Sequence, residues 1–248
     1  KYFAGIRDPI CIINKYRQRG YGTIINDYEK IHTLYYNYTS SEWNRIFKLN
    51  NPKVNIERLK EKTGIDTRYI SNSNESVIEI SVKCSEKIFK KFPKKKIDSI
   101  ILVTQTSPYR IPTTACILQN KLGLRKDIVA FDINLGCSGF LYALRMTTSL
   151  INSKQIKNGL IICADTYTKY ISKNNTACRP IFSDAAAATL VTSNKKNMIG
   201  PFELGADGSG ADALELPMGS NEIIMHGAKV LTFAMDIVPK NVNHLLKK

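Results

Sequence analysis

The chain has 248 residues, of which 43% are hydrophobic and 23% charged, and this ordinary balance excludes a wholly disordered protein. Its hydrophobic runs are short, the longest being Leu160–Ala164 and Ala185–Val191. A membrane-spanning helix needs about 18 consecutive apolar residues, so no membrane span is expected. The stretch Lys1–Arg7 lacks a basic head followed by an apolar block, so we also expect no signal peptide.

The chain is strongly basic. Thirty-six Lys and Arg residues against 21 Asp and Glu residues give a formal net charge of +15. Such an excess indicates either a lysine-rich solvated surface or an anionic partner. No zinc finger, helix-turn-helix or aromatic RNA-binding signature accompanies the charge, so nucleic acid is not the expected partner.

The six cysteines are scattered along the chain without a C-x-x-C pair. This spacing argues against a zinc ribbon or a thioredoxin-type site, and no metal is expected. A chain that can build a large core does not need a disulfide scaffold. We therefore expect most of the thiols to be small buried side chains and the protein to be cytoplasmic.

From about residue 54 onward, the hydrophobic pattern predicts helices that alternate with buried strands. The predicted helices cover residues 74–92, 112–122, 138–153 and 225–246. Pro239 should bend or interrupt the last of them. The predicted strands cover residues 97–105, 128–133, 159–164, 186–192 and 199–204. Continuous apolar strands between helices are typical of a parallel or mixed sheet covered on both faces, so an α/β fold is expected.

The segment Asp132–Ala143 is the strongest candidate for chemistry. In it a buried strand ends, Gly136 makes a tight turn, and Cys137 stands at the first turn of an apolar helix. This places the thiol at the carboxyl edge of a sheet, where α/β proteins bind ligands, and near free helix N–H groups that favour a thiolate. The small Gly136 and Gly139 would let a substrate approach. From spacing alone, a nucleophile and a packed core cysteine both remain open.

Four segments, taken in order, resemble the thiolase superfamily and, within it, beta-ketoacyl-acyl-carrier-protein synthase III. They are Lys62–Arg68, Pro112–Gln119, Asp132–Ala143 and Phe182–Ala188, with weaker matches at Ala206–Ser209 and Met225–Gly227. The resemblance implies a thiolase-like layered fold in which mixed sheets are covered by helices. It divides the chain into an irregular N-terminal region with the first strand (1–53), a first half that carries the nucleophile (54–197), and the start of an incomplete second half (198–248).

The resemblance also implies an acyltransferase that forms an acyl-enzyme on Cys137 from acyl-coenzyme A and condenses it with malonyl-acyl carrier protein, in fatty acid or related acyl biosynthesis. Acyl-coenzyme A and acyl carrier protein would be its partners, with no cofactor and a second copy in a homodimer. Lys62, Lys169 and Gly227 match positions that bind coenzyme A. Ile111 matches a residue that crosses the dimer interface to the partner's acyl tunnel. A solvated charge for either lysine and a core position for Ile111 remain open.

The resemblance breaks down where the family places the His and Asn that stabilise the enolate during decarboxylation. His32, His226 and His244 match neither position, and Asn175 is interpreted as a loop residue. We expect the chain to be part of a longer enzyme, because the second half would otherwise have an open sheet edge. The other explanation is that this half is lost or supplied by another polypeptide.

Two alternative functions therefore stay open besides the condensation. One is acyl transfer to an amine or alcohol of a sugar or secondary metabolite, which needs no decarboxylation. The other is a non-catalytic acyl-binding subunit.

Overall fold

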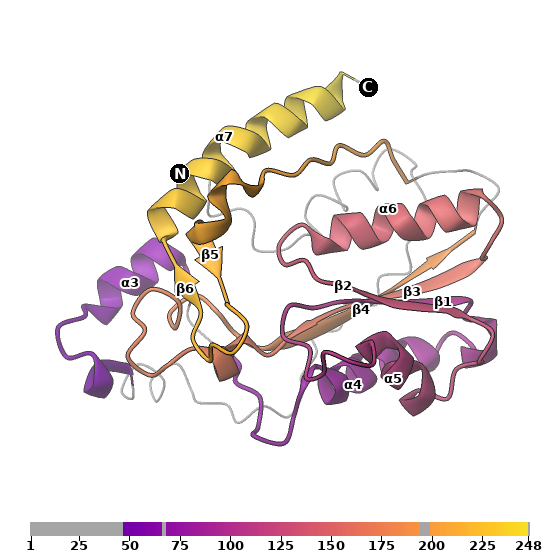
Figure 1. Ribbon diagram of the computed structural model, residues 1–248, viewed down its shortest axis with the longest axis horizontal. Helices are drawn as coiled ribbons and strands as arrows, with labels where there is room; N and C mark the ends of the chain where they lie inside the picture. Colours follow the sequence, from indigo (N-terminus) through magenta and orange to yellow (C-terminus); the bar gives the residue numbers. More distant parts are fainter. Residues whose placement is uncertain (1–46, 66–67, 194–198, 248) are drawn as a thin grey trace.

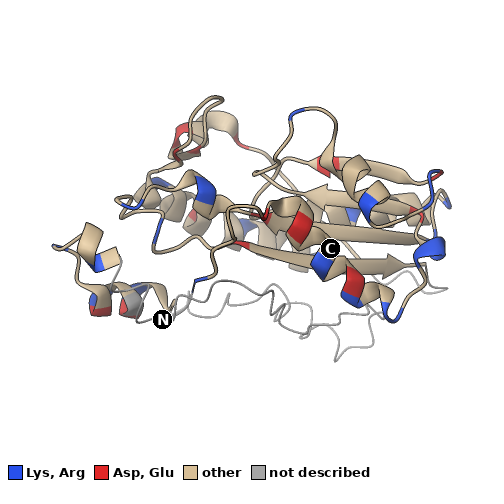
Figure 2. Cartoon of the chain, turned by 90° about the horizontal axis from the view of Figure 1, so that it is seen from below, with Lys and Arg blue, Asp and Glu red and all other residues tan. Residues whose placement is uncertain are grey.

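The computed structural model describes residues 47–65, 68–193 and 199–247 (Figure 1). A four-stranded sheet lies at its centre and has helices on both faces. The predicted irregular region before residue 47, with its first strand and His32, lies outside the described residues. No helix in the described ranges has both the length and the hydropathy needed to cross a membrane. Figure 2 shows Lys and Arg residues distributed over several elements, with Asp and Glu among them.

The sheet has the strand order β2-β1-β3-β4. β1 (Ser99–Val103), β2 (Val129–Ile133) and β3 (Asn158–Asp165) are parallel, whereas β4 (Ala185–Thr192) is antiparallel to β3. Val103 pairs with the last residue of β2 on one side and with Cys163 of β3 on the other. The three parallel strands therefore end almost level, and the loops that follow them meet at one edge of the sheet.

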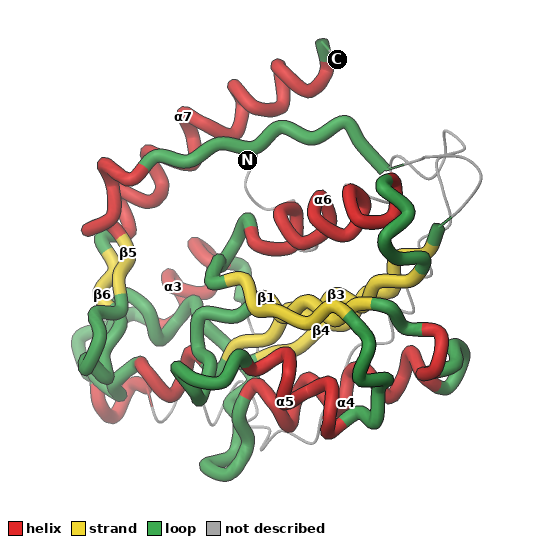
Figure 3. The backbone as a smooth tube through the Cα atoms, turned by 45° about the vertical axis from the view of Figure 1, so that its right-hand side comes forward, coloured by secondary structure: helices red, strands yellow, loops and turns green. Residues whose placement is uncertain are grey.

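Helices bury both faces of this sheet. α4 (Val77–Phe89) and α5 (Thr114–Lys121) cover one face, and α6 (Gly139–Asn152) covers the other (Figure 3). Successive side chains of a strand point to opposite faces. Ile100 and Leu102 of β1 accordingly pack with α4 and α5, while the alternate residues of the strand pack beneath α6. This arrangement confirms the α/β class and the two-sided cover predicted from the apolar strands.

Carboxylates fix the start of two of these helices. Ser76 precedes α4, and its hydroxyl accepts a hydrogen bond from the N–H of Ile78 while Glu79 accepts one from the backbone N–H of Ser76, which forms a capping box. α5 begins under the carboxylate of Asp132 in β2, which accepts the N–H groups of Thr114 and Ala115, each at 2.7 Å. The second cap ties α5 to the strand that leads to Cys137.

The predicted elements between residues 74 and 192 are all present, with bounds that shift by a few residues. The predicted strand at 199–204 is wrong, because residues 199–207 form no strand. Pro201 has no N–H to donate to a sheet, and Ile199 and Phe202 instead pack against the cluster beneath α6. The last helix, α7 (Gly227–Leu246), continues through Pro239, so the helix is not interrupted there, and a bend, the other effect predicted for this proline, stays a prediction. α7 has no buried residue, so water can bind the carbonyl that Pro239 leaves without a donor.

Short elements complete the described structure. They are α3 (Ile56–Thr63), the 3-10 helices η1 (Lys94–Lys96), η2 (Tyr167–Tyr170) and η3 (Gly208–Ala213), and a hairpin of β5 (Leu214–Glu215) with β6 (Ile224–Met225). η2 directly follows β3 and therefore lies at the carboxyl edge of the sheet. The hairpin leads into α7 (Figure 1).

The capping box of α4 supplies a test of this architecture. Replacement of Ser76 by Ala removes the acceptor for the Ile78 N–H and should lower the free energy of unfolding by about 1 kcal/mol. Urea denaturation followed by circular dichroism measures the change. Ser73→Ala is the matched control, because this serine is exposed and lies outside the cap. Equal stabilities of the two variants would contradict the assigned cap.

Candidate active site

Cys137 lies in the connection between β2 and α6, at the carboxyl edge of the sheet. The N–H of Gly139 donates to the carbonyl of Gly136 at 2.9 Å, which closes a tight turn over Cys137. The residue is exposed and precedes the first turn of α6 instead of lying within it. The predicted strand–turn–helix placement is confirmed, and the exposure does not fit a packed core cysteine.

Protein side chains lie close to both glycines beside Cys137. A Cβ atom at Gly139 would collide with Cγ1 of Val103, because the start of α6 rests directly on β1. A Cβ atom at Gly136 would lie 2.5 Å from Oε1 of Gln105. The sequence-based interpretation that both glycines leave room for substrate is therefore wrong for Gly139, whereas at Gly136 the space beside the Cα atom holds only the end of the exposed Gln105 side chain and of Tyr167.

Gln105 and Tyr167 form a hydrogen-bonded pair next to this turn. The phenol of Tyr167 in η2 donates to Oε1 of Gln105 at 2.6 Å. Burial raises the pKa of Tyr167, and electrostatic interactions with Asp165 and Cys137 raise it further. Tyr167 therefore stays protonated and lies within electrostatic reach of the Cys137 thiol. The sequence analysis missed this pair, although Gln105 is the last residue of one predicted strand and Tyr167 lies three residues after another, and that position was the available signal.

The carboxylate of Asp165, the last residue of β3, holds the loop that carries Gln105. It accepts the N–H of Gln105 at 2.8 Å and the N–H of Thr106 at 3.0 Å. The hydroxyls of Thr104 and Thr106 donate to the same carboxylate oxygen at 3.0 and 2.8 Å. Burial raises the pKa of Asp165, and these donors only partly offset that effect. One carboxylate thus joins the ends of β1 and β3 just beside Cys137.

A second carboxylate, Asp184, fixes η2 from the side of β4. It is fully buried and accepts the N–H and hydroxyl of Thr168 at 2.9 and 2.6 Å. The N–H and hydroxyl of Ser71 donate to it as well, at 2.8 and 2.7 Å. A buried carboxylate with this many donors is well satisfied. Because Thr168 is the residue after Tyr167, this anchor fixes the position of the tyrosine backbone.

Two of the other predicted site residues share the carboxyl edge with Cys137. Ile111 follows β1 and is 86% exposed, which does not fit a core position. Lys169 belongs to η2, and its ammonium group donates to the carbonyls of Ser73 and Glu75. It is therefore bound by a neighbouring loop instead of being a purely solvated charge.

The remaining two predicted site residues come from outside the sheet. Lys62 is exposed on α3, and Gly227 is the exposed first residue of α7. No hydrogen bond or ion pair joins any two of the five predicted site residues, all of which the structure describes. What brings Cys137, Ile111 and Lys169 to one edge is the strand topology alone.

Asn175, one of the residues considered for a decarboxylation role, is bound within the described structure. Asn175 accepts the N–H of Cys178 at 2.8 Å and donates to Glu222 at 2.6 Å, so its interpretation as a loop residue is confirmed. Nδ1 of His244 lies 3.7 Å from Oε1 of Glu203. Within the described ranges, no group of His, Cys, Asp and Glu side chains is arranged to hold a metal ion.

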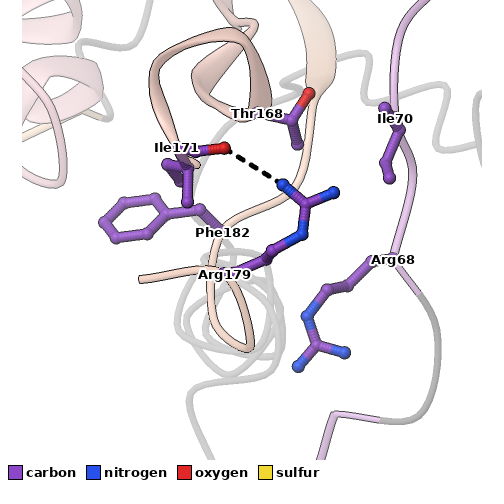
Figure 4. A pocket seen from close by; sticks show the side chains of 6 residues that line it. All are labelled: Arg68, Ile70, Thr168, Ile171, Arg179 and Phe182. Carbon is purple, nitrogen blue, oxygen red and sulfur yellow. Dashed lines mark hydrogen bonds between the residues drawn. The ribbon is translucent and has the colours of Figure 1, made fainter. Parts of the chain in front are cut away.

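A small pocket lies next to Phe182, and Cys137 does not line it (Figure 4). Its lining residues are Arg68, Ile70, Thr168, Ile171, Arg179 and Phe182. The Phe182 ring packs against Tyr167 with the two centroids 5.0 Å apart. Arg179 donates to the carbonyl of Ile171 at 3.0 Å, and burial lowers the pKa of Arg68 to about 10. The pocket is thus connected to Tyr167 through Phe182, and it does not contain the Cys137 thiol.

Comparison with known proteins places this site in a family. Residues 131–208, which include Cys137, match the family profile described as 3-oxoacyl-[acyl-carrier-protein (ACP)] synthase III. A beta-ketoacyl-[acyl-carrier-protein] synthase III of Clostridium perfringens is 36% identical over 77% of this chain and 64% of its own length. A crystal structure of 3-oxoacyl-(acyl-carrier-protein) synthase III is 31% identical, covers 82% of this chain and 68% of its own, and superimposes with a TM-score of 0.77. The chain belongs to the 3-oxoacyl-acyl-carrier-protein synthase III family.

Membership of the synthase III family confirms the thiolase-like layered fold. The corresponding synthase of Aquifex aeolicus superimposes with a TM-score of 0.75 at 26% identity and covers 85% of this chain and 67% of its own. The chain spans about 64% of the length of the Clostridium perfringens relatives that it matches. The second half of the fold is therefore only partly represented, as predicted.

The cysteines of this synthase III family chain should differ sharply in reactivity. Burial raises the pKa of Cys84 and Cys163 to about 12 and also raises the pKa of buried Cys178. At about pH 8 these three thiols carry almost no thiolate. Of the cysteines in the described ranges, iodoacetamide should therefore label the exposed Cys116 and Cys137 first, as measured by peptide mass spectrometry. Labelling of Cys163 as fast as that of Cys137 would contradict the burial described here.

Proposed function

We propose that the protein is an acyltransferase of the synthase III type, in which Cys137 takes an acyl group from acyl-coenzyme A and condenses it with malonyl-acyl carrier protein. The observation that carries the proposal is the exposed thiol of Cys137 on a closed turn at the carboxyl edge of the sheet. In a chain of this family, that is the placement a nucleophile for large thioester substrates requires.

The proposed chemistry proceeds in two steps through a covalent intermediate. The Cys137 thiolate attacks the thioester carbonyl, coenzyme A leaves as its thiol, and the acyl group stays on sulfur. Malonyl-acyl carrier protein then loses carbon dioxide, its C2 carbanion attacks the acyl carbonyl, and the thiolate is released. Among the described residues the N–H of Cys137 donates to no acceptor, so it can stabilise the oxyanion, a contribution of about 3 kcal/mol in related acyl transfers.

The proposed partners follow from charge and exposure. Lys62 and Lys169 would bind the phosphates of coenzyme A, with Gly227 beside its pantetheine arm. The net charge of +15 suits both this anionic substrate and an acidic carrier protein. β2 is an edge strand of the sheet and Ile111 is 86% exposed, which supports a homodimer across this side. No cofactor is part of the proposal, and the cytoplasmic location stays a prediction.

Acylation of Cys137 tests the proposal directly. The protein incubated with acetyl-coenzyme A should gain the mass of one acetyl group, and peptide mapping should place the group on Cys137. Cys137→Ala should abolish the gain, because the thiol is the acceptor. Cys116→Ala should retain it, since this exposed cysteine lies on α5 outside the turn. Label on another cysteine would contradict the proposal, and no label at all would favour the acyl-binding subunit.

Release of carbon dioxide separates the condensation from acyl transfer to an amine or alcohol. The second reaction needs no decarboxylating His and Asn, and Asn175, which was considered for that role, is bound to Glu222 in the described structure. If the condensation is correct, acylated protein should release labelled carbon dioxide from malonyl-acyl carrier protein, and Cys137→Ala should lower the rate at least a hundredfold. Acylation of Cys137 without any release would support transfer to an amine or alcohol.

A further inference from the structure

The Gln105–Tyr167 pair lies beside Cys137 and has no part in the proposed reaction. Oε1 of Gln105 and the phenol of Tyr167 would lie 2.5 and 3.5 Å from a Cβ atom at Gly136, the residue before the nucleophile. Adjacent Cα atoms are about 3.8 Å apart. The side chains of Gln105 and Tyr167, which lie next to Gly136, can therefore contact the first few carbons of an acyl group on Cys137 but not its distal end.

Contacts with neighbouring residues fix the position of both members of the pair. The Tyr167 ring packs against Phe182, and the adjacent Thr168 is bound to Asp184 by its N–H and hydroxyl. The backbone of Gln105 is bound to Asp165 at 2.8 Å. Side chains held in this way can discriminate between substrates, because they lose little conformational entropy when a substrate binds.

The direction of the hydrogen bond leaves a donor free. The protonated Tyr167 donates its one proton to Oε1 of Gln105 at 2.6 Å, so the carbonyl side of the amide is occupied. Among the described residues, the NH₂ group of Gln105 has no hydrogen-bond partner, and the side chain is exposed. The site therefore presents a fixed, neutral N–H donor next to the nucleophile.

We propose that the NH₂ group of Gln105 donates a hydrogen bond to a hydroxyl or keto oxygen near C3 of the acyl group on Cys137, so that neutral oxygen-bearing acyl groups are preferred over plain hydrocarbon ones. This inference rests on the proposed acyl-enzyme and names its substrate class. A hydrocarbon chain would displace the water bound to the Gln105 amide and offer no acceptor for its N–H group in return. An acidic acyl group is disfavoured because the carboxylate of Asp165 is bound directly to the backbone of Gln105.

Competition between two acyl donors tests the inference. The protein is mixed with equal amounts of 3-hydroxybutyryl-coenzyme A and butyryl-coenzyme A, and intact mass gives the rate at which each acyl group is loaded on Cys137. The hydroxylated donor should be preferred about tenfold, the value of one good hydrogen bond. Gln105→Leu should remove the preference. Tyr167→Phe should reduce it, because the amide is no longer oriented.

Further variants separate this role from a structural one. Gly136→Ala should lower the preference as well, since the new Cβ would lie 2.5 Å from Oε1 of Gln105 and so push the amide out of position while its backbone stays bound to Asp165. Gln155→Leu, at an exposed position after α6, and Tyr170→Phe, in the same 3-10 helix, are matched controls that should keep the wild-type ratio.

The outcomes distinguish the two proposals. Loading of both donors at equal rates in the wild type, or an equal loss of both in Gln105→Leu, would overturn the inference and leave the acyl-enzyme standing. Acylation of Cys137 by neither donor would overturn the inference, and it would overturn the acyl-enzyme as well only if acetyl-coenzyme A also fails to label Cys137.

Discussion

The site depends on one half-buried carboxylate at the end of β3. Asp165 accepts four hydrogen bonds from the three residues that follow β1, and so it joins two strands that are distant in sequence. Without these bonds the N–H groups of the loop would need other acceptors at a partly buried edge, where unpaired donors are costly. The carboxylate thus sets the position of Gln105, and through it the surroundings of the thiol.

The register of the sheet makes this arrangement possible. Val103 of β1 pairs with both Ile133 and Cys163, so the three parallel strands deliver their following loops to the same place. Gly139 then allows α6 to start against Val103. The turn that carries Cys137 is therefore held between a strand end and a helix start, which explains how an exposed residue is kept in a defined position.

Carboxylates recur as the fixing element along this edge. Asp132 caps α5, Asp165 holds the loop after β1, and Asp184 holds η2. Each sits at or next to a strand terminus and accepts backbone N–H groups that no sheet partner can satisfy. The same edge exposes the nucleophile and the Gln105 amide, so the polar groups that stabilise the fold also define the chemical character of the site.

The sequence by itself determined the α/β class, the helices and strands between residues 74 and 192, and the turn at Cys137, because these follow from local hydrophobic periodicity and from glycine and proline positions. It misassigned residues 199–204, where the apolar pattern resembled a strand but Pro201 cannot join a ladder. Only the tertiary structure decided which side chains surround the thiol. Gln105 and Tyr167 are 62 positions apart, and their 2.6 Å hydrogen bond exists because parallel pairing brings two strand ends together. No local pattern encodes such a contact, since it depends on strand order and register.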